Sequence, residues 1–408
     1  MKITAIRLRR VRGTAETEGP HWEDRAVRPL DVYPHYREDR WRPEVGQAVT
    51  YFERGEQIDD HHLRLASTFL QIDTDEGVSG VAGPLAPSAA MLVGLHLAPV
   101  VTGCDPLASE YLWDVMHRTL SHGRQGDGMM AISAIDCALW DLRGKWFGVP
   151  AYRLAGGPTR ETVPAYASMF GFGVGDLGMV RERAKWAQAQ GYRAQKWFLR
   201  YGPMSGHEGL RRNVDVVRTV REAIGEDDDI MIDFWTALDV PYTVALAERV
   251  AEYRPRWIEE PVMADRVDSY KRIRQRISIP VAGGEHEYTR WGLRRFVDEG
   301  ALDVLQPDIY WAGGLSETLK IAGYATAHDL ITMPHGTSPQ ATLHFSATQS
   351  PIHTPQQEFL IKFSTVTQHF LRHRVEPVDG ELVLDDTPGL GMELDPDRIE
   401  SETELEPA

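Results

Sequence analysis

Three acidic residues stand at or just after the ends of short apolar runs, at equal intervals along the chain. They are Asp233, Glu259 and Glu285, and the intervals are 259 − 233 = 26 and 285 − 259 = 26 residues. Equal steps indicate one strand-containing unit repeated, with each strand end adding a carboxylate to a common site. Each acid could instead stabilise the start of the helix that follows it, but three at one interval favour a metal site. Carboxylate oxygens are hard ligands that suit Mg²⁺ far better than zinc, so we expect Mg²⁺.

A second pair of residues could act as an acid–base group. Asp308 and His335 each follow an apolar run and are one such unit apart, since 335 − 308 = 27. On neighbouring strands, Asp308 would accept a hydrogen bond from His335, which orients the ring and raises its basicity. A histidine before a glycine is more often a turn residue, but the strand-end aspartate favours a dyad. Glu358, at the end of the last apolar run, could face the same pocket or be a rim charge.

These residues need a scaffold that brings strand ends together. From residue 163 to residue 360, eight short apolar runs alternate with seven amphipathic helical segments. This alternation is typical of a parallel βα barrel, although a doubly wound open sheet would also show it. The barrel is favoured because ligands from the third, fourth and fifth strands suit a closed ring of strand ends. We expect strands at 163–169, 192–198, 229–233, 256–259, 279–285, 302–306, 330–334 and 357–360.

The rest of the chain predicts a second domain. Residues 1–155 combine alternating strand patterns with a helical pattern at 129–146, and we interpret them as an α+β domain. Within them, the long aperiodic stretch at about 13–56 indicates either disorder or a functional lid, and its aromatic residues favour a lid. The barrel would occupy residues 156–365. Residues 366–408 are expected to return to the α+β domain and to end beyond Asp395 in a solvated acidic tail.

Composition excludes several classes of partner. The chain has 408 residues, which suggests two or three domains. A formal net charge of −16 argues against nucleic acid and anionic membrane surfaces as partners. The two cysteines, Cys104 and Cys137, form no disulfide framework, and the N-terminus lacks the apolar core of a signal peptide. We therefore expect a soluble, cytoplasmic protein.

Several stretches resemble the enolase superfamily, in its mandelate racemase-like branch. Residues 138–150 resemble the family's helix between cap and barrel, and 257–261 and 306–308 resemble its strand-four and strand-six signatures. Within that branch the resemblance is strongest to the L-rhamnonate dehydratases, in residues 19–22, 233–235, 284–292, 313–315 and 334–338. It implies an α/β fold, a modified TIM barrel (β/α)7β with an α+β N-terminal capping domain, and a homo-oligomer.

The resemblance also implies a role for each matching residue. Asp233, Glu259 and Glu285 would bind Mg²⁺. His335 with Asp308 would be the base and then the acid, Lys196 would sit near the substrate carboxylate, and Glu358 would join this catalytic group. His21 on the lid and His286 beside the metal would contact substrate hydroxyls. Arg40 is the candidate for the lid arginine of this pattern.

One departure from the wider family bears on the reaction. Phe198 stands where many members carry the second lysine of a Lys-x-Lys motif, so a base on the opposite face of the substrate is missing. This argues against a racemase. We expect a Mg²⁺-dependent dehydratase that removes the proton α to a carboxylate and eliminates the 3-hydroxyl, giving a 2-keto-3-deoxy acid from a small-molecule substrate like L-rhamnonate. The alternatives are a dehydratase or epimerase of another aldonate or aldarate, such as L-lyxonate, L-mannonate or galactarate, and a non-catalytic binding protein.

Overall fold

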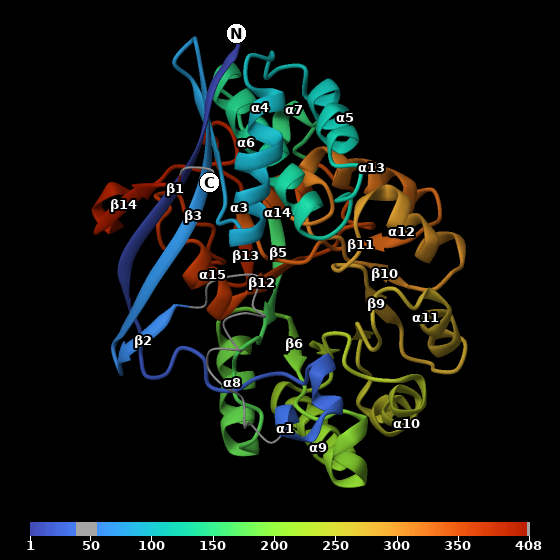
Figure 1. Cartoon of the computed structure of the whole chain (residues 1–408). Coiled ribbons are helices and arrows are strands. Elements are labelled where there is room, and N and C mark those ends of the chain that lie inside the picture. The colour runs from blue at the N-terminus through green and yellow to red at the C-terminus, as the bar shows by residue number, and fades with distance from the viewer. Residues whose placement is uncertain (38–54, 406–408) are drawn as a thin grey trace.

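An antiparallel sheet forms one side of the molecule in the computed structural model, which describes residues 1–37 and 55–405 (Figure 1). Its strands are β1 (Ile3–Glu16), β2 (Glu56–Asp59), β3 (His62–Thr74), β4 (Ser79–Ala82) and β14 (Ser401–Glu404). The order is β14-β1-β3-β2, with β4 beside β3. The turn at Asp75-Glu76-Gly77 joins β3 to β4, as the hairpin pattern predicts, and Gly77 supplies the positive φ of 75°.

A second, almost wholly parallel sheet carries the repeated units. Its strands are β5 (Thr162–Ser168), β6 (Ala194–Phe198), β7 (Asp229–Asp233), β8 (Trp257–Glu259), β9 (Val281–Gly283), β10 (Val304–Leu305), β11 (Ile331–Thr332) and β12 (Gln357–Leu360). They follow one another in chain order from β5 to β11, and β12 lies beside β5. Backbone hydrogen bonds such as Thr332 N to His353 O span the remaining gap between β11 and β12. The eighth strand therefore returns to the first, as in a barrel.

Seven helices connect these strands and cover the outside of the barrel (Figure 1). They are α8 (Leu177–Ala189), α9 (Gly206–Ile224), α10 (Val240–Val250), α11 (Val267–Arg274), α12 (Thr289–Asp298), α13 (Gly314–Thr326) and α14 (Pro339–Ser346). Local signals set their ends: the side chain of Asp239 accepts from Tyr242 N at the start of α10, and Gly225 follows α9 with a positive φ of 79°. The predicted fold class is confirmed, and each predicted barrel strand lies within a few residues of its expected place.

The remaining helices of the described residues belong to the cap, to the segment that follows β1 and to the C-terminal region. They are η1 (Pro29–Val32), α1 (Pro34–Arg37), α3 (Pro87–Leu92), the π-helix η2 (Val93–Leu97), α4 (Ala98–Val101), α5 (Ser109–Thr119), α6 (Asp127–Phe147), α7 (Ala151–Leu154) and α15 (Ile361–Thr367). Short 3₁₀ turns lie at η3 (Pro203–Ser205), η4 (Ala251–Tyr253) and η5 (Pro396–Arg398), and β13 (Glu381–Val383) pairs antiparallel with β5. None of the described helices is long and apolar enough to cross a membrane.

Helix α6 joins the cap to the barrel. It contacts β3 and β4 on one side and α13 on the other, which explains why apolar residues surround it rather than forming one stripe. Two cap indoles extend the contact: Trp113 Nε1 donates to Gly313 O at 2.8 Å and Trp140 Nε1 donates to Ser316 Oγ at 2.8 Å. Cap and barrel side chains thus share one buried apolar cluster.

Residues 401–404 are exposed, as the prediction of a solvated tail beyond Asp395 requires, but they also form a strand. They form β14, which pairs antiparallel with β1 so that Val11 faces Glu402 and Arg9 faces Glu404 (Figure 1). Arg9 Nε lies 2.6 Å from Glu402 Oε1. The acidic residues remain exposed, but backbone pairing and the arginines of β1 order them.

The segment after β1 crosses the carboxyl ends of barrel strands. Glu23 N donates to Gly171 O beyond β5, and Val27 N donates to Leu199 O beyond β6, both at 2.9 Å. Lys362 Nζ, beyond β12, lies 2.6 Å from Glu23 Oε1. Residues 38–54 of the expected lid, with Arg40, lie outside the described residues, and β1 continues to Glu16 into the stretch expected to be aperiodic.

Candidate active site

Strand alternation places the polar candidates at one end of the barrel. A ring of apolar side chains fills the interior, each from a different strand or the residue after it: Tyr166, Ala194, Met231, Trp257, Ala282, Val304 and Met333. Side chains two residues further along a strand point to the same face. Lys196, Asp233 and Glu259 therefore form the next interior layer, at the carboxyl ends of β6, β7 and β8, where active sites of parallel barrels lie.

Lys196 is the positive centre of this layer. Its Nζ lies 3.1 Å from Asp233 Oδ2 and 2.8 Å from Glu358 Oε1, and it also pairs with Glu259. The side chain is fully buried. Burial lowers the pKa of Lys196, but the charges of Glu259, Glu358 and Asp233 outweigh burial and raise it well above its ordinary value. Lys196 therefore stays a cation.

The carboxylates outnumber the cations near them. Burial raises the pKa of Glu259 to about 8 and that of Glu285 to about 7, and it also raises the pKa of Asp233. Neighbouring carboxylates raise these pKa values further, while nearby cations such as Lys196 lower them. Glu259 Oε2 accepts from Trp257 Nε1 and Gln306 Nε2, both at 2.8 Å, which fixes its orientation. A buried, oriented set of hard oxygen donors with excess negative charge suits a divalent cation such as Mg²⁺.

His335 and Asp308 form the predicted dyad. His335 Nδ1 lies 2.8 Å from Asp308 Oδ2, and a parallel bridge joins the two residues beyond β10 and β11. Thr337 Oγ1 and Tyr310 N donate to the same carboxylate at 2.5 and 2.7 Å. His335 Nε2 lies 3.7 Å from Glu285 Oε2. Burial lowers the pKa of His335, but Glu285 and Asp308 outweigh it and raise the pKa to about 10.

Glu358 faces the interior rather than the rim. It is fully buried, and Gly336 N donates to its Oε2 at 3.0 Å, next to the dyad histidine. Its Oε1 pairs with Lys196. Burial raises the pKa of Glu358, but Lys196 and His335 outweigh burial and lower it. Glu358 thus links the Lys196 group to the His335 side of the site.

His286 belongs to a cluster that the sequence did not assign. Oxygen and nitrogen atoms of Glu260, Glu285 and His286 lie within 4.8 Å of one another. His286 Nδ1 is 2.8 Å from Glu260 Oε2 and 3.7 Å from Glu285 Oε1. Burial lowers the pKa of His286, but Glu260 outweighs it and raises the pKa to about 9. Glu285 is therefore shared between the predicted metal ligands and this cluster.

Two residues near the site escaped the sequence reasoning. Glu260 is buried beside Glu259, within the quoted strand-four signature, and only its acidic type could have signalled a role. Trp311 lies between the two histidines, with ring centroids 5.5 Å from His286 and 5.1 Å from His335. No spacing rule singles out Trp311, since it follows Asp308 in a turn.

His21 lies at the edge of this assembly. Its Nε2 is 3.0 Å from Lys362 O, four residues beyond Glu358, and its ring contacts Trp22 edge-on. Burial lowers the pKa of His21. In the part of the chain that the structure describes, no hydrogen bond joins His21 to the other candidates.

The structure gathers Asp233, Glu259 and Glu358 around Lys196, and it places Glu285 beside His335 and His286. Among the described residues, the three possible ligand atoms that all lie within 4.8 Å of one another are those of Glu260, Glu285 and His286, not those of the three predicted Mg²⁺ ligands. His21 lies beside these groups.

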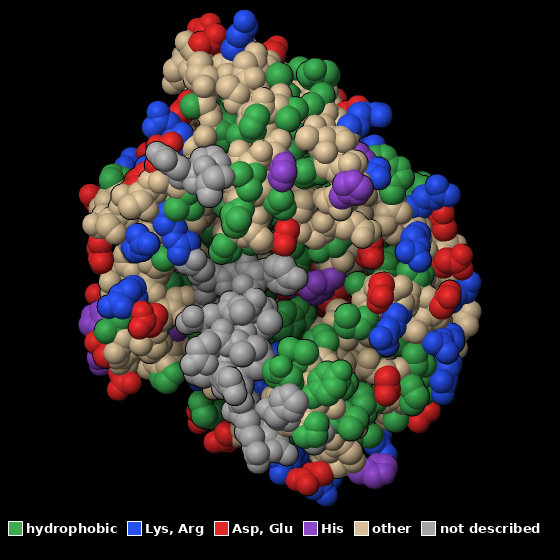
Figure 2. Space-filling view, in the orientation of Figure 1, with side chains coloured by type: hydrophobic (Ala, Val, Ile, Leu, Met, Phe, Trp, Pro, Cys, Tyr) green, Lys and Arg blue, Asp and Glu red, His purple; other side chains and the backbone are tan. Residues whose placement is uncertain are grey.

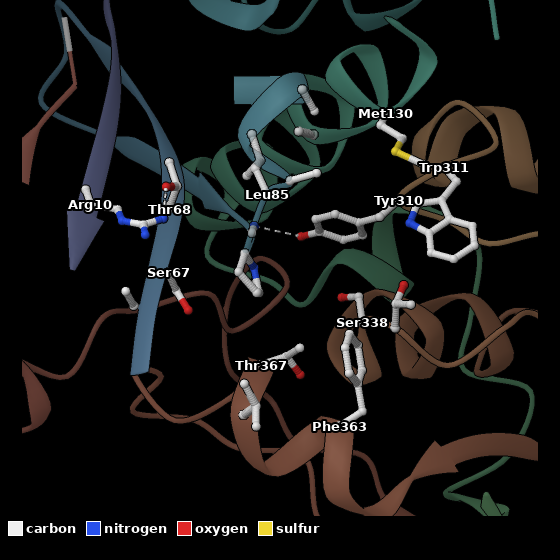
Figure 3. Close-up of a pocket in the computed structure, with 18 residues that line it drawn as sticks. Arg10, Ser67, Thr68, Leu85, Met130, Tyr310, Trp311, Ser338, Phe363 and Thr367 are labelled. Atoms are coloured by element: carbon white, nitrogen blue, oxygen red, sulfur yellow. Dashed lines mark hydrogen bonds between the residues drawn. The ribbon is translucent and has the colours of Figure 1, made fainter. Parts of the chain in front are cut away.

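A cavity of about 70 Å³ lies between cap and barrel next to the dyad (Figure 3). Tyr310 crosses it, and Gly83 N donates to Tyr310 Oη at 3.2 Å. Thr337, which donates to Asp308, lines the same cavity. Its volume is enough for a few water molecules. On the face of the molecule shown in Figure 2, acidic and basic side chains intermingle.

The fold and the site define the class of protein. Carboxylates, a lysine and a histidine–aspartate dyad converge at the carboxyl end of a parallel βα barrel under an α+β cap, which is the arrangement of a barrel enzyme that performs acid–base chemistry beside a cation. Residues 62–156 match the family model "Mandelate racemase / muconate lactonizing enzyme, N-terminal domain", and residues 178–398 match "Enolase C-terminal domain-like". The chain belongs to the mandelate racemase / muconate lactonizing enzyme family of the enolase superfamily, and the resemblance inferred from the sequence is confirmed.

Relatives span nearly the whole chain. The L-rhamnonate dehydratase of Saccharopolyspora erythraea is 34% identical over 412 residues, covering 97% of each chain. The crystal structure of L-rhamnonate dehydratase from Gibberella zeae superposes with a TM-score of 0.81 at 32% identity, over 97% of this chain and 94% of that one. A second structure of the Gibberella zeae enzyme, complexed with Mg, gives a TM-score of 0.80 at 31% identity, over 97% and 95% of the two chains.

Proposed function

We propose that this protein is a Mg²⁺-dependent acid-sugar dehydratase, a hydro-lyase that acts on L-rhamnonate or an aldonate like it. The observation that carries the proposal is the convergence of Lys196, the strand-end carboxylates and His335, whose Nε2 lies 3.7 Å from Glu285. The names of the relatives, and the Mg in one of their structures, support the same reaction and cation. A cytoplasmic homo-oligomer is part of the proposal by family likeness.

Asp233, Glu259 and Glu285 would hold the cation. When bound, Mg²⁺ supplies Lewis acidity to a substrate carboxylate and offsets the charge of Glu285, which otherwise raises the pKa of His335. Lys196 and Glu358 would hold the carboxylate end of the substrate, with Lys196 supplying positive charge where negative charge develops. Their burial excludes water from this end of the site.

His335 would carry the proton. Asp308 accepts from Nδ1, so Nε2 is the atom that removes the proton from C2. The same nitrogen then returns the proton to the 3-hydroxyl as the C3–O bond breaks, and water leaves. The enol that remains tautomerises to a 2-keto-3-deoxy acid.

The residue expected on the opposite face of the substrate, Phe198, favours elimination over epimerisation. Phe198, at the end of β6, packs against Phe170 with ring centroids 5.0 Å apart. An aromatic ring cannot deliver a proton to C2. A single base is sufficient for an elimination in which one group first takes and then gives the proton.

The test is a screen of purified protein with Mg²⁺ against a library of aldonates and aldarates, with detection of 2-keto acids. We expect product from L-rhamnonate or a close stereochemical relative, no product in excess EDTA, and return of activity when Mg²⁺ is added. Absence of keto acid across the whole library would contradict the dehydratase proposal. Epimerised substrate without keto acid would favour the epimerase alternative.

A further inference from the structure

Glu260 is a buried acid outside the Lys196 group. Lys196 pairs with Asp233, Glu259 and Glu358, whereas the only hydrogen bond or ion pair of the Glu260 carboxylate within the described chain is to His286. Its other oxygen, Oε1, is buried with no hydrogen-bond partner. A buried carboxylate with one specific partner carries a desolvation cost that the rest of the fold must support.

The backbone of Glu260 adopts an uncommon conformation. Its φ is +42°, in the left-handed region that non-glycine residues rarely adopt. Neighbouring loops hold it there, because Glu260 N donates to Ala282 O at 3.0 Å and Thr236 N donates to Glu260 O at 2.7 Å. In an extended strand, the residue after the inward-facing Glu259 would point away from the barrel interior. The turn instead brings the carboxylate to 2.8 Å from His286 Nδ1.

The contact with Glu260 determines which ring nitrogen of His286 is available to bind a ligand. Nδ1 faces Glu260, while one side of the ring lies against Trp311. Among the described residues, Nε2 of His286 has no hydrogen-bond partner, and the side chain is 28% exposed. The arrangement parallels Asp308 and His335, in which a carboxylate also holds Nδ1 and leaves Nε2 to the site. Which ring nitrogen is available is set by the hydrogen bond that the other one makes.

We propose that Glu260 is a positioning residue that holds His286 so that Nε2 meets a hydroxyl of the acid-sugar substrate. This inference rests on the proposed function and adds a specificity element to the same site. Glu260 contributes to binding of the polyhydroxyl chain, and the proton transfers remain with His335. It is distinct from the metal ligands, although its carboxylate lies near Glu285.

The experiment compares steady-state kinetics of Glu260→Ala and Glu260→Gln on the best aldonate, with Mg²⁺ affinity measured by calorimetry. Loss of an oriented, charge-assisted hydrogen bond is expected to raise KM by about tenfold or more in Glu260→Ala, with kcat changed less than about threefold. Glu260→Gln keeps an acceptor for Nδ1 and is expected to retain more of the binding. Mg²⁺ affinity should stay within about twofold, because a positioning residue does not bind the ion.

Two controls make the result specific. Glu287→Gln alters a neighbouring buried acid that packs against Gly292 and should leave KM unchanged. The KM of the double variant, His286→Gln with Glu260→Ala, should be no higher than that of His286→Gln alone, because a residue that acts only through His286 adds nothing once His286 is replaced.

Several outcomes would overturn the inference. With an active wild-type protein, an unchanged KM in Glu260→Ala would contradict it, and so would a fall in kcat alone. A tenfold or greater loss of Mg²⁺ affinity in this variant would instead make Glu260 a metal ligand. A wild-type protein that converts no aldonate contradicts the proposed function itself, and this inference with it. Thermal unfolding of each variant separates these effects from loss of folding.

Discussion

The buried carboxylates of the site carry more negative charge than the cations near them can offset, and the ammonium of Lys196 offsets part of it. The ammonium is fully buried among Asp233, Glu259 and Glu358. Removing one partner of a buried ion pair leaves the other charges uncompensated, which costs about 3–5 kcal/mol. We predict that Lys196→Met lowers the free energy of unfolding by an amount of that order in EDTA, and by less in Mg²⁺ because a bound cation offsets part of the charge.

Chemical unfolding of Lys196→Met, with and without Mg²⁺, measures this effect. Lys271→Met is the matched control, because Lys271 forms an exposed pair with Glu299 that contributes little. Equal stability of Lys196→Met and wild type in EDTA would contradict the charge argument.

His335 is the residue whose replacement separates catalysis from binding. Asparagine keeps a hydrogen-bonding group near Asp308 but cannot accept the C2 proton. General acid–base groups contribute about 10²–10⁴-fold to rate, and one residue that both takes and gives the proton should lie at the upper end. We predict that His335→Asn lowers kcat by about 10⁴-fold with a small change in KM. Substantial turnover by this variant, judged beside the exposed-histidine control His207→Asn, would show that the dyad mechanism is wrong.

The sequence could indicate residues whose roles follow from periodicity. Asp233, Glu259, Asp308 and His335 lie at strand ends or beside them, so equal spacing along the chain becomes proximity in space. Glu260 could not be assigned this way, because its direction depends on a left-handed backbone turn that loops elsewhere in the sequence enforce. Trp311 likewise reaches the histidines through a turn that follows no repeat.

At the level of elements, β14 shows where local composition misleads. Ser401–Glu404 is polar and acidic, which by itself predicts disorder, yet the arginines of β1 face it across the sheet. Pairing between distant segments is set by complementarity that neither segment shows alone. The barrel strands and helices were predictable because each repeats a local pattern of apolar and polar residues, whereas β14 depends on a partner almost 400 residues away.

We predict that deletion of residues 401–408 exposes the edge of β1. Amide hydrogens in and around Arg9–Arg12 should exchange about tenfold faster, corresponding to a loss of about 1.4 kcal/mol of local stability. Glu402→Gln tests the charge separately, and it should produce a smaller, salt-sensitive effect because the pair with Arg9 is partly exposed. Unchanged exchange after the longer deletion would contradict a stabilising role for β14.

At the scale of the whole molecule, cap and barrel are held together by buried contacts beyond α6. One of them joins α7 to α14: Tyr152 N donates to His344 Nδ1 at 3.1 Å, and the two rings stack with centroids 5.4 Å apart. This bond requires an unprotonated Nδ1. Burial lowers the pKa of His344 to about 4, from an ordinary value of 6.5. The folded protein therefore binds fewer protons at this residue than the unfolded chain does between these two pH values.

The sign of the pH dependence follows from this difference. Because the unfolded state binds more protons between pH 6.5 and about 4, stability is fully present above pH 6.5 and falls as the pH drops through that window. Two pH units correspond to about 2.7 kcal/mol for one group. The amide oxygen of an asparagine at position 344 can accept from Tyr152 N. We predict that, between pH 6.5 and 4.5, the free energy of unfolding of His344→Asn falls by about 2 kcal/mol less than that of the wild type. Asp136 acts in the opposite direction, since burial raises its pKa to about 6, but it is common to both proteins and cancels in their difference. Denaturant unfolding of both proteins in EDTA across this pH range measures how the free energy of unfolding changes with pH. Equal slopes for wild type and His344→Asn would contradict a neutral, buried His344 between α7 and α14.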